Sequence, residues 1–460
     1  MSRLAMTRRT ALCLFCVAFL RDADLLRAQP SAVPTNIGTN QTYLIDLPTA
    51  LRLAGARNLD IQIARQRLAE AKANYESAIW LLFPWIAPGA SYRRHENLIQ
   101  ETDGTILDVH KQAYVVGPSL TGQLELGDAI YKNLAARQLV KAADYGLESQ
   151  RLDTIVAAAQ GYFDLAKAQS AVGVAKEAVA ISTNYQDQVQ EAVSAGIAFK
   201  GDLFRVQVQT ERNLLSLRQA QEQQRVAAAR LAQTLQLDST VELMPRENEL
   251  VPISLLDTNA SLDSLVVQGL GARPELKQSR AFIEAARQAR AGAIYGPLVP
   301  ALGAQVFAGG LGGGRDGTPS SFGETEDYQF TLGWRIGPGG LLDRGSIHAT
   351  ESRLRIARLS DQKARDEVIR QIIESLTRVQ SLRDQTATAQ RAVQAAEETL
   401  RLTRQRKEYA VGTVLENIQA EQELTSTRLA YLNAIAEYNK AQYLLSHAIG
   451  GGGSRASREP

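Results

Sequence analysis

A long stretch near the C-terminus repeats its apolar residues at the spacing of an α-helix. No glycine lies between Ser346 and Val411, and no proline lies between Pro338 and Pro460. The apolar residues recur every 3.5 to 3.6 positions or so, as a supercoiled helix requires; they are Val368, Ile372, Leu376, Val379, Leu382, Ala389, Val393, Ala396 and Leu400. This pattern predicts one helix of about 65 residues, roughly 100 Å long.

Each long helix is followed by a glycine and a second helical segment. Gly412 ends the stretch just described, and Thr413 to His447 predicts a returning helix. The first half follows the same plan, with Asp128 to Ala195, then Gly196, then Phe199 to Leu237. Glycine tolerates the positive φ that such a reversal needs. Because helices this long need a partner along their length, two hairpins in one chain predict a bundle built from several chains.

Two further segments alternate apolar and polar residues with a period of two. In one, five apolar residues alternate with Gln329, Thr331, Gly333 and Arg335; they are Tyr328, Phe330, Leu332, Trp334 and Ile336. The segment from Tyr114 to Leu126 alternates in the same way. A membrane barrel around a wet lumen produces this pattern, and so does a one-sided sheet in a soluble protein. Aromatic residues on the apolar side favour strands that face lipid.

The two halves of the chain align with each other at an offset of about 215 residues. The matches occur in the same order in both halves. They are Asp46-Leu47 with Ser261-Leu262, Asn58 to Ile61 with Arg273 to Leu276, Phe83 to Ile86 with Val299 to Leu302, Leu126 to Asp128 with Leu341 to Asp343, Ala178-Val179 with Ala392-Val393, and Ala195 to Ile197 with Val411 to Thr413. Asp46 and Ser261 are expected to cap helices. Each half therefore reads as helix, two strands, long helix, turn and helix, with connecting loops expected at 96–108 and 309–326.

The N-terminus has the features of a secretory signal peptide. A basic segment with Arg3, Arg8 and Arg9 precedes an apolar run at 11–20, and Ala28 is a suitable residue before a cleavage site. Both cysteines lie inside the apolar run, so their spacing indicates no metal site. No later segment has the roughly 18 consecutive apolar residues of a transmembrane helix. The net charge of +2 gives no indication of a nucleic-acid partner.

Four strands per chain are too few for a closed barrel, because about eight are the least that enclose packed side chains. The sequence therefore predicts that several chains each contribute four strands. Three chains would give twelve.

At this point the sequence resembles the TolC-type outer membrane efflux protein family. The resemblance covers about 44–450 and rests on motifs in both halves: Asn58, the stretch Arg273-Pro274-Glu275-Leu276, the prolines Pro84 and Pro300 before the strands, Leu126-Gly127-Asp128, Leu342-Asp343, the two turn glycines, and the closing Tyr438-Asn439-Lys440-Ala441-Gln442. It implies a mainly α fold with a membrane β-barrel, in which a trimeric twelve-stranded barrel stands on a periplasmic α-helical tunnel.

The predicted domain organisation follows the duplication. The boundaries are 1–28 for the signal peptide, 29–45 for an N-terminal segment, 46–236 for the first repeat, 237–261 for an equatorial linker, 262–449 for the second repeat, and 450–460 for a flexible tail.

The resemblance also implies a function, partners and functional residues. The chain would be the outer-membrane channel of a tripartite efflux or type I secretion system. It would act as a homotrimer in contact with outer-membrane lipid, a periplasmic adaptor protein and an inner-membrane pump. Gly196, Gly412 and Thr413 would form the adaptor-docking tips, and the strand residues from Tyr328 to Ile336 would face lipid.

The pore constriction departs from the family pattern in the second hairpin. The family often has an acid six residues after the turn glycine, and Asp202 matches it after Gly196. In the second hairpin Ile418 stands at that position, so Glu416 becomes the candidate acid. Tyr409 matches a tyrosine that the family uses to close the tip. An ordinary helix-start acid, favoured by the helix dipole, is the competing interpretation of Glu416.

Nothing in the sequence indicates catalysis, a cofactor or a metal. No two of the four histidines have metal-ligand spacing, and all four are expected to be solvated. The glycines at 309–314 lack the Lys-Ser/Thr of a phosphate-binding loop and are expected to lie in a connecting loop. The alternative function is a periplasmic adaptor or coiled-coil scaffold, which would have one hairpin flanked by small β modules.

Overall fold

The computed structural model describes residues 42–83, 85–238, 241–247, 249–256, 260–315, 321–408 and 413–451, all within the unit Thr42–Pro460. The first half contains β1 (Thr42–Ile45), α2 (Leu47–Arg57), α3 (Leu59–Trp80), β2 (Trp85–His95), β3 (Leu98–Gln100), β4 (Ile106–Asp108), β5 (Lys111–Leu124), α4 (Leu126–Ser194) and α5 (Lys200–Leu235). The second contains β6 (Glu242–Pro245), α6 (Leu262–Ala272), α7 (Pro274–Tyr295), η2 (Gly296–Leu298), β7 (Ala301–Arg315), β8 (Ser321–Gly333), α8 (Arg344–Glu408) and α9 (Val414–Ala448).

Corresponding elements of the two halves have matching lengths and caps. Helices α2 and α6 have 11 residues each, and α3 and α7 have 22 each. The Asp46 side chain accepts a hydrogen bond from the Thr49 amide, and the Ser261 side chain accepts one from the Ser264 amide. Both predicted N-caps are confirmed, because each satisfies an amide that the first turn of a helix leaves free.

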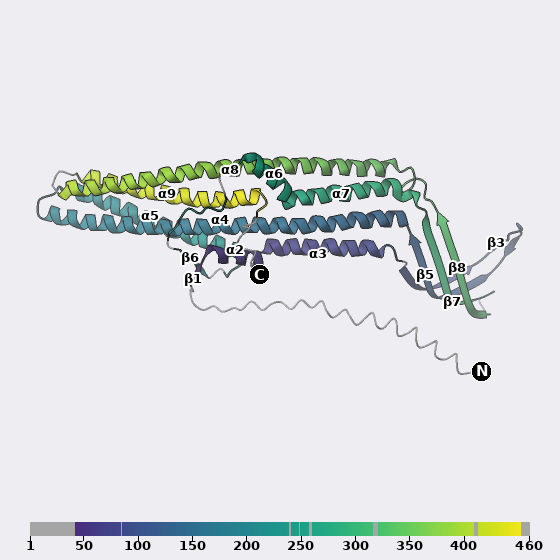
Figure 1. Cartoon of the computed structure of the whole chain (residues 1–460). Helices are drawn as coiled ribbons and strands as arrows, with labels where there is room; N and C mark the ends of the chain where they lie inside the picture. Colours follow the sequence, from purple (N-terminus) through teal and green to yellow (C-terminus); the bar gives the residue numbers. More distant parts are fainter. Residues whose placement is uncertain are drawn as a thin grey trace, which may run out of the picture. The chain divides into compact units, whose positions relative to one another are not determined.

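The long helices lie side by side as two hairpins, α4 with α5 and α8 with α9 (Figure 1). Helix α4 has 69 residues and α8 has 65, as the periodicity predicts. The apolar stripe of α8 is buried throughout, except that Ala389 and Val393 are only half-buried. Because α4 also contacts α7 and α9, it joins the two halves.

The core consists of two large apolar clusters, one centred on each half. The first holds Tyr162, Leu231 and Leu235 together with Ile45 and Leu243, which come from the parallel strand pair β1–β6. The second is formed by α6, α7, α8 and α9 and includes Leu265, Leu276, Val368, Ile372 and Leu445. Helix α9 contributes Tyr443 to the first cluster and Tyr438 to the second, so it packs between them.

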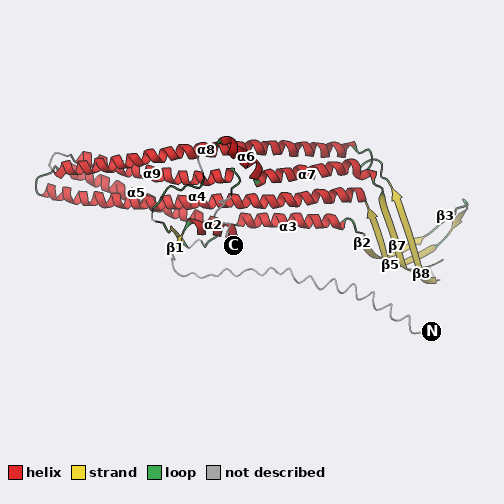
Figure 2. Cartoon of the chain, in the orientation of Figure 1, coloured by secondary structure: helices red, strands yellow, loops and turns green. Residues whose placement is uncertain are grey.

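A four-stranded antiparallel sheet lies at one end of the helices, in the order β2-β5-β7-β8 (Figure 2). The central pair β5–β7 joins the strand pair of the first half to that of the second. The ends of the strands where α4 and α8 begin are called the helix-side end here, and the opposite ends the far end.

The strands extend further than the sequence predicts. The segment 309–326, expected to be a loop, contributes Gly309 to Arg315 to β7 and Ser321 to Glu326 to β8. Glycine is needed in β7, because a Cβ on Gly309 would lie 2.3 Å from the Val116 carbonyl oxygen on β5. The expected loop at 96–108 likewise contains the small antiparallel pair β3–β4.

The predicted strand from Tyr328 to Ile336 is too long by three residues. Strand β8 ends at Gly333, so Trp334 and Ile336 lie beyond it. The Trp334 indole donates to the Leu298 carbonyl at 3.1 Å, and Gly337 adopts a φ of +111°. This left-handed residue turns the chain away from the sheet.

In the described part of the chain, no helix has the length and apolar composition needed to cross a membrane.

Candidate functional site

One face of the sheet is apolar and exposed. Residues directly opposite each other in an antiparallel pair lie on the same face. The register pairs Leu332 with Leu302 and pairs Tyr328 with Val306, which in turn lies opposite Leu120. In the single chain Tyr328 is 63% exposed, Phe330 76% and Leu332 62%. A contiguous patch of exposed apolar side chains of this kind marks a surface that contacts a membrane or another protein.

On its other face the sheet is polar at the helix-side end, where it lines a cavity. Gln329 lies opposite Gln305, which lies opposite Thr121, and Thr331 lies opposite Gly303 on the same face. These residues line a cavity of about 880 Å³ at the helix-side end. Four of the charged groups that line it form two pairs: Arg335 bonds Glu125 at 2.7 Å, and Lys132 bonds Asp128 at 2.6 Å. The fifth, Asp343, accepts hydrogen bonds from the backbone amides of Gly339 and Ser346. At this end the sheet therefore separates an apolar surface from a polar one.

The first hairpin turns at Gly196, as the sequence predicts. Gly196 has a φ of +76°, and the amides of Gly196 and Ile197 bond the carbonyls of Val193 and Ala192. This is the Schellman arrangement, which satisfies the last carbonyls of α4. Ile197 is 83% exposed and Phe199 73%. The tip therefore presents apolar side chains to its surroundings.

Two predicted residues of the second tip, Tyr409 and Gly412, lie outside the described residues. Thr413 caps α9 and forms a capping box with Glu416: its side chain accepts from the Glu416 amide while the Glu416 side chain accepts from the Thr413 amide. Glu416 also lies 3.5 Å from the Arg406 guanidinium. In a single chain this geometry matches the helix-start interpretation of Glu416.

The predicted acid of the first tip, Asp202, lies in the first turn of α5. It is paired with Arg205 at 3.0 Å, and its side chain is 26% exposed. Among the described residues, Asp202 and Glu416 therefore belong to separate ion pairs, and no hydrogen bond joins the two acids.

A buried polar group that the sequence reasoning missed lies close to both tips. Glu421 on α9 is 8% exposed and accepts from the Asn417 amide group at 2.9 Å. Burial raises the pKa of Tyr185 to about 12, with smaller contributions from the carboxylates of Glu421 and Asp202. The spacing in the sequence could have predicted this burial. Glu421 is three residues after Ile418 and three before Leu424, so it lies on the same face of the helix as these two buried residues.

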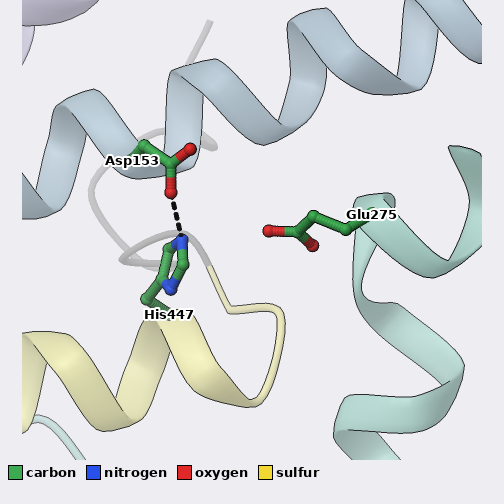
Figure 3. Close-up of side chains that lie close together, drawn as sticks. All are labelled: Asp153, Glu275 and His447. Atoms are coloured by element: carbon green, nitrogen blue, oxygen red, sulfur yellow. Dashed lines mark hydrogen bonds and ion pairs between the residues drawn. The ribbon is translucent and has the colours of Figure 1, made fainter. Parts of the chain in front are cut away.

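Three potential metal ligands come together where α4, α7 and α9 meet. Ligand atoms of Asp153, Glu275 and His447 lie within 4.8 Å of one another (Figure 3). The prediction of a solvated histidine is wrong for His447, because its side chain is 15% exposed and its Nε2 bonds Asp153 at 2.8 Å. The long helix α4 supplies a partner that lies 294 residues away along the chain.

Arg273 decides the chemistry of this cluster. Its guanidinium lies 2.8 Å from Nδ1 of His447 and also donates to the His447 carbonyl. Arginine can only donate, so Nδ1 accepts, and Nε2 carries the proton that His447 donates to Asp153. A metal ion would need the lone pair of that Nε2. The cluster as it stands is therefore a hydrogen-bond network and lacks a free imidazole ligand.

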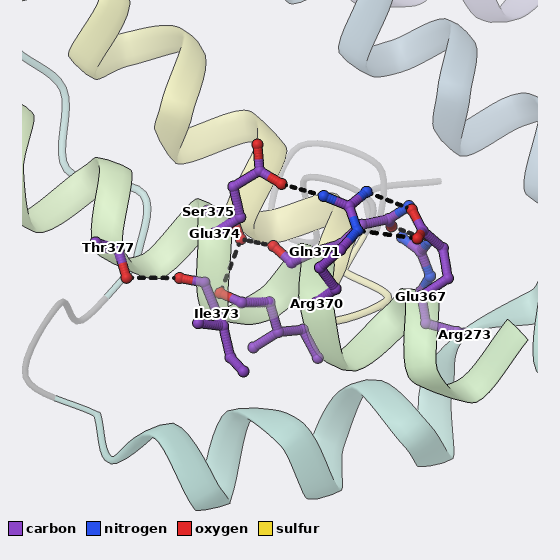
Figure 4. A network of polar contacts seen from close by, with 9 residues as sticks. Arg273, Glu367, Arg370, Gln371, Ile373, Glu374, Ser375 and Thr377 are labelled. Atoms are coloured by element: carbon purple, nitrogen blue, oxygen red, sulfur yellow. Dashed lines mark hydrogen bonds and ion pairs between the residues drawn. The ribbon is translucent and has the colours of Figure 1, made fainter. Parts of the chain in front are cut away.

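Arg273 also joins a network on α8 (Figure 4). It donates to Gln371 at 2.7 Å, and Gln371 donates to Glu367. Two hydrogen bonds from Arg370 to Glu367, at 2.6 and 3.0 Å, are the main reason that the pKa of Glu367 falls to about 2.

The corresponding residue of the first half has the same core function. Asn58 donates to the Thr234 carbonyl near the end of α5, just as Arg273 donates to the His447 carbonyl near the end of α9. The duplicated position therefore ties each short helix pair to its returning arm. Of the two residues, Arg273 also bonds a side chain of another long helix, Gln371 on α8.

A model of the family described as outer membrane efflux protein matches residues 50–235 and 265–451. The chain is 23% identical over 415 residues to nodulation protein T of Rhizobium leguminosarum bv. trifolii, covering 86% of this chain and 84% of that protein.

Solved structures share the fold. The Campylobacter jejuni CmeC outer membrane channel superposes with a TM-score of 0.74 at 18% identity, covering 90% of this chain and 87% of that one. The outer membrane protein VceC of Vibrio cholerae gives 0.74 at 19%, covering 88% and 96%.

Proposed function

The chain belongs to the outer membrane efflux protein family, and we propose that three copies of it form a passive duct from the periplasm to the exterior. It is an efflux channel of the outer membrane. A passive duct needs no catalytic group, cofactor or metal, and we assign none. The adaptor alternative is not retained, because the family match covers two hairpin-containing segments.

The observation that carries the duct is the division of the sheet into two faces. The apolar face exposes Tyr328, Phe330 and Leu332, while the opposite face holds Gln305, Gln329 and Thr331 around the cavity. An outward apolar face and a hydrated inner face are what a barrel in lipid requires. We therefore assign Tyr328, Phe330 and Leu332 to lipid contact. Trp334 and Ile336 follow at the level where the sheet meets the helices.

The edges of the sheet explain why several copies are needed. Within the described part of the chain, β2 and β8 each pair with one strand only. Open edges and four strands do not form a closed barrel. In the proposed trimer, β8 of one copy pairs with β2 of the next, which gives twelve strands.

The helices also expose apolar faces that a neighbouring copy would cover. Helix α5 exposes Phe204, Val208 and Leu215, which are spaced along one side of the helix, and α8 exposes Ile373. Burying such stripes against another helix is the usual source of stability for long helices. The domain boundaries predicted from the sequence are retained as part of this proposal.

We propose that the hairpin tips bind a periplasmic adaptor, which links the duct to an inner-membrane pump. Gly196 and Thr413 position the turns, and the exposed side chains of Ile197 and Phe199 supply apolar surface. Gly412 and Tyr409 belong to the same predicted tip. Asp202, Glu416 and Tyr409 remain the proposed constriction residues.

Two measurements test the duct. Detergent-extracted outer membranes should contain the protein as a heat-resistant trimer, and the purified protein should form ion-conducting pores in planar bilayers. A monomer without conductance that extracts with the periplasmic fraction would contradict the proposal.

A further inference from the structure

The far end of the polar face carries basic residues that have no described function. Lys111 begins β5, and it lies on the same face as Thr121 because successive side chains of a strand alternate with a period of two. His95 lies directly opposite Lys111, and Arg93 lies two residues before His95 on the same face. Arg93, His95 and Lys111 are called the far-end basic cluster.

Within the part of the chain that the structure describes, the far-end basic cluster has no counter-charge. Among the described residues, no hydrogen bond or ion pair joins Arg93, His95 or Lys111 to another side chain. The Nε2 atom of His95 is buried and has no hydrogen-bond partner among the described residues. At the helix-side end of the same face, by contrast, Arg335 and Lys132 are both paired with carboxylates.

The two described acids nearest in the sequence, Glu96 and Asp108, have other partners. Glu96 bonds Arg94 and His110, and Asp108 lies 4.0 Å from Nε2 of His110. Arg94 provides a comparison within the same strand, since it lies on the opposite, apolar face and is paired with Glu96. The paired arginine faces the lipid side and the unpaired one faces the polar side.

Arg93 and Lys111 are diagonal neighbours across the β2–β5 pair, because His95 stands directly opposite Lys111 and Arg93 lies two residues before it. Long side chains at diagonal positions are within reach of each other, so the two positive charges repel. A bound anion would reduce that repulsion. In the proposed trimer the cluster occurs three times around the lumen, at the ends of the strands furthest from the helices (Figure 1). Charges of one sign around an opening concentrate counter-ions there.

We propose that the far-end basic cluster forms a collar at the outer mouth of the duct that binds anionic solutes, with phosphate or carboxylate groups as ligands. This inference rests on the proposed duct. Arginine binds such groups through paired hydrogen bonds, and lysine binds them as a point charge. The collar lies on the face opposite the apolar one, so its ligand is a solute in the lumen and not a lipid headgroup.

The experiment uses the full-length protein in planar bilayers of uncharged lipid at low salt, with tripolyphosphate added to one side at a time. We expect the current to be blocked more strongly from one side than from the other. The block should weaken at high salt, because screening shortens the reach of the charges. The double variant Arg93→Gln/Lys111→Gln should need about tenfold more tripolyphosphate or more, since a hydrogen bond to a charged group contributes that much.

Arg94→Gln is the matched control, since it removes a neighbouring charge from the opposite face. It should keep the wild-type block within about twofold. A wild-type block that is equal from both sides overturns the collar without any variant, and so does a double variant that responds like wild type. If Arg94→Gln loses the block as well, or if anionic lipid abolishes it, the cations bind headgroups and the proposal is wrong. Wild-type protein that forms no pore would overturn the duct itself, and with it the collar.

Discussion

Replacing Phe330 by arginine tests the orientation of the sheet. Phe330 is 76% exposed in the single chain, so in water an arginine there would change stability by no more than about 0.5 kcal/mol. In lipid the cost depends on depth. It is about 2–4 kcal/mol for arginine at the middle of the bilayer and about 0–1 kcal/mol near the interface.

The depth of Phe330 can be worked out by taking Gly333, the last residue of β8, as the edge of the apolar band. Phe330 lies three residues from Gly333. At about 3.4 Å per residue this is about 10 Å along the strand, or about 8 Å in height for a strand tilted by about 40°. An apolar band is about 25 Å tall, which places Phe330 roughly a third of the way in. We therefore expect a cost of about 2 kcal/mol, which lowers the ratio of inserted to unfolded protein about 30-fold.

Gln329→Arg is the matched control, because it introduces the same side chain one residue away on the face that lines the cavity. Folding into lipid vesicles at graded urea concentrations, read from heat-resistant migration, measures both variants. Gln329→Arg should resemble wild type, and Phe330→Arg should not. Equal effects of the two variants would refute the assignment of the faces.

Three further predictions concern the helices. In urea unfolding, Gly196→Ala should lower the free energy of unfolding by about 1–2 kcal/mol, because Gly196 has a φ of +76°. Gly173→Ala, inside α4 with free space around it, should raise the free energy of unfolding by up to about 1 kcal/mol. Changes of the same sign in both variants would contradict the turn assignment. The pKa of Glu367 is depressed to about 2, so its contribution to stability is present above about pH 4.5 and is lost as the pH falls toward 2. The melting temperature of Glu367→Gln should accordingly change less over that range than wild type, and parallel curves would argue against the network. Arg273→Ala removes a 4%-exposed cation and should lower the free energy of unfolding, measured by thermal unfolding, by about 3–5 kcal/mol. Arg273→Asn, which places at 273 the residue found at Asn58, should recover part of that free energy. An asparagine variant no more stable than the alanine variant would show that the two positions are not equivalent.

Local pattern was enough to predict the secondary structure of most of the chain. The apolar stripe of α8, the caps at Asp46 and Ser261, and the turn at Gly196 depend on residues a few positions apart, and all are found in the structure. The strand alternation at Tyr328, Phe330 and Leu332 is likewise visible in the sequence. Local pattern predicted too long a loop at 309–326. Glycines in a sequence suggest a turn, and here they are needed because the neighbouring strand β5 approaches the backbone closely.

The contacts between the halves could not be predicted in this way. His447 was expected to be solvated, but packing of α9 against α4 places it beside Asp153. Glu421 is buried where α9 meets residues of α4, α5 and α8, among them Ala178, Gln209 and Leu400. No spacing along the chain encodes such neighbours.

The sequence by itself thus determined the duplication, the helical hairpins and the presence of two-faced strands, since each follows from periodicity within one segment. The tertiary structure decided that β5 pairs with β7, which makes one continuous sheet from two strand pairs and aligns their apolar faces. It also placed Arg93 beside His95 and Lys111 on the polar face. The physical reason is that cross-strand register and helix packing depend on surfaces brought together by folding, whose residues lie far apart in the chain.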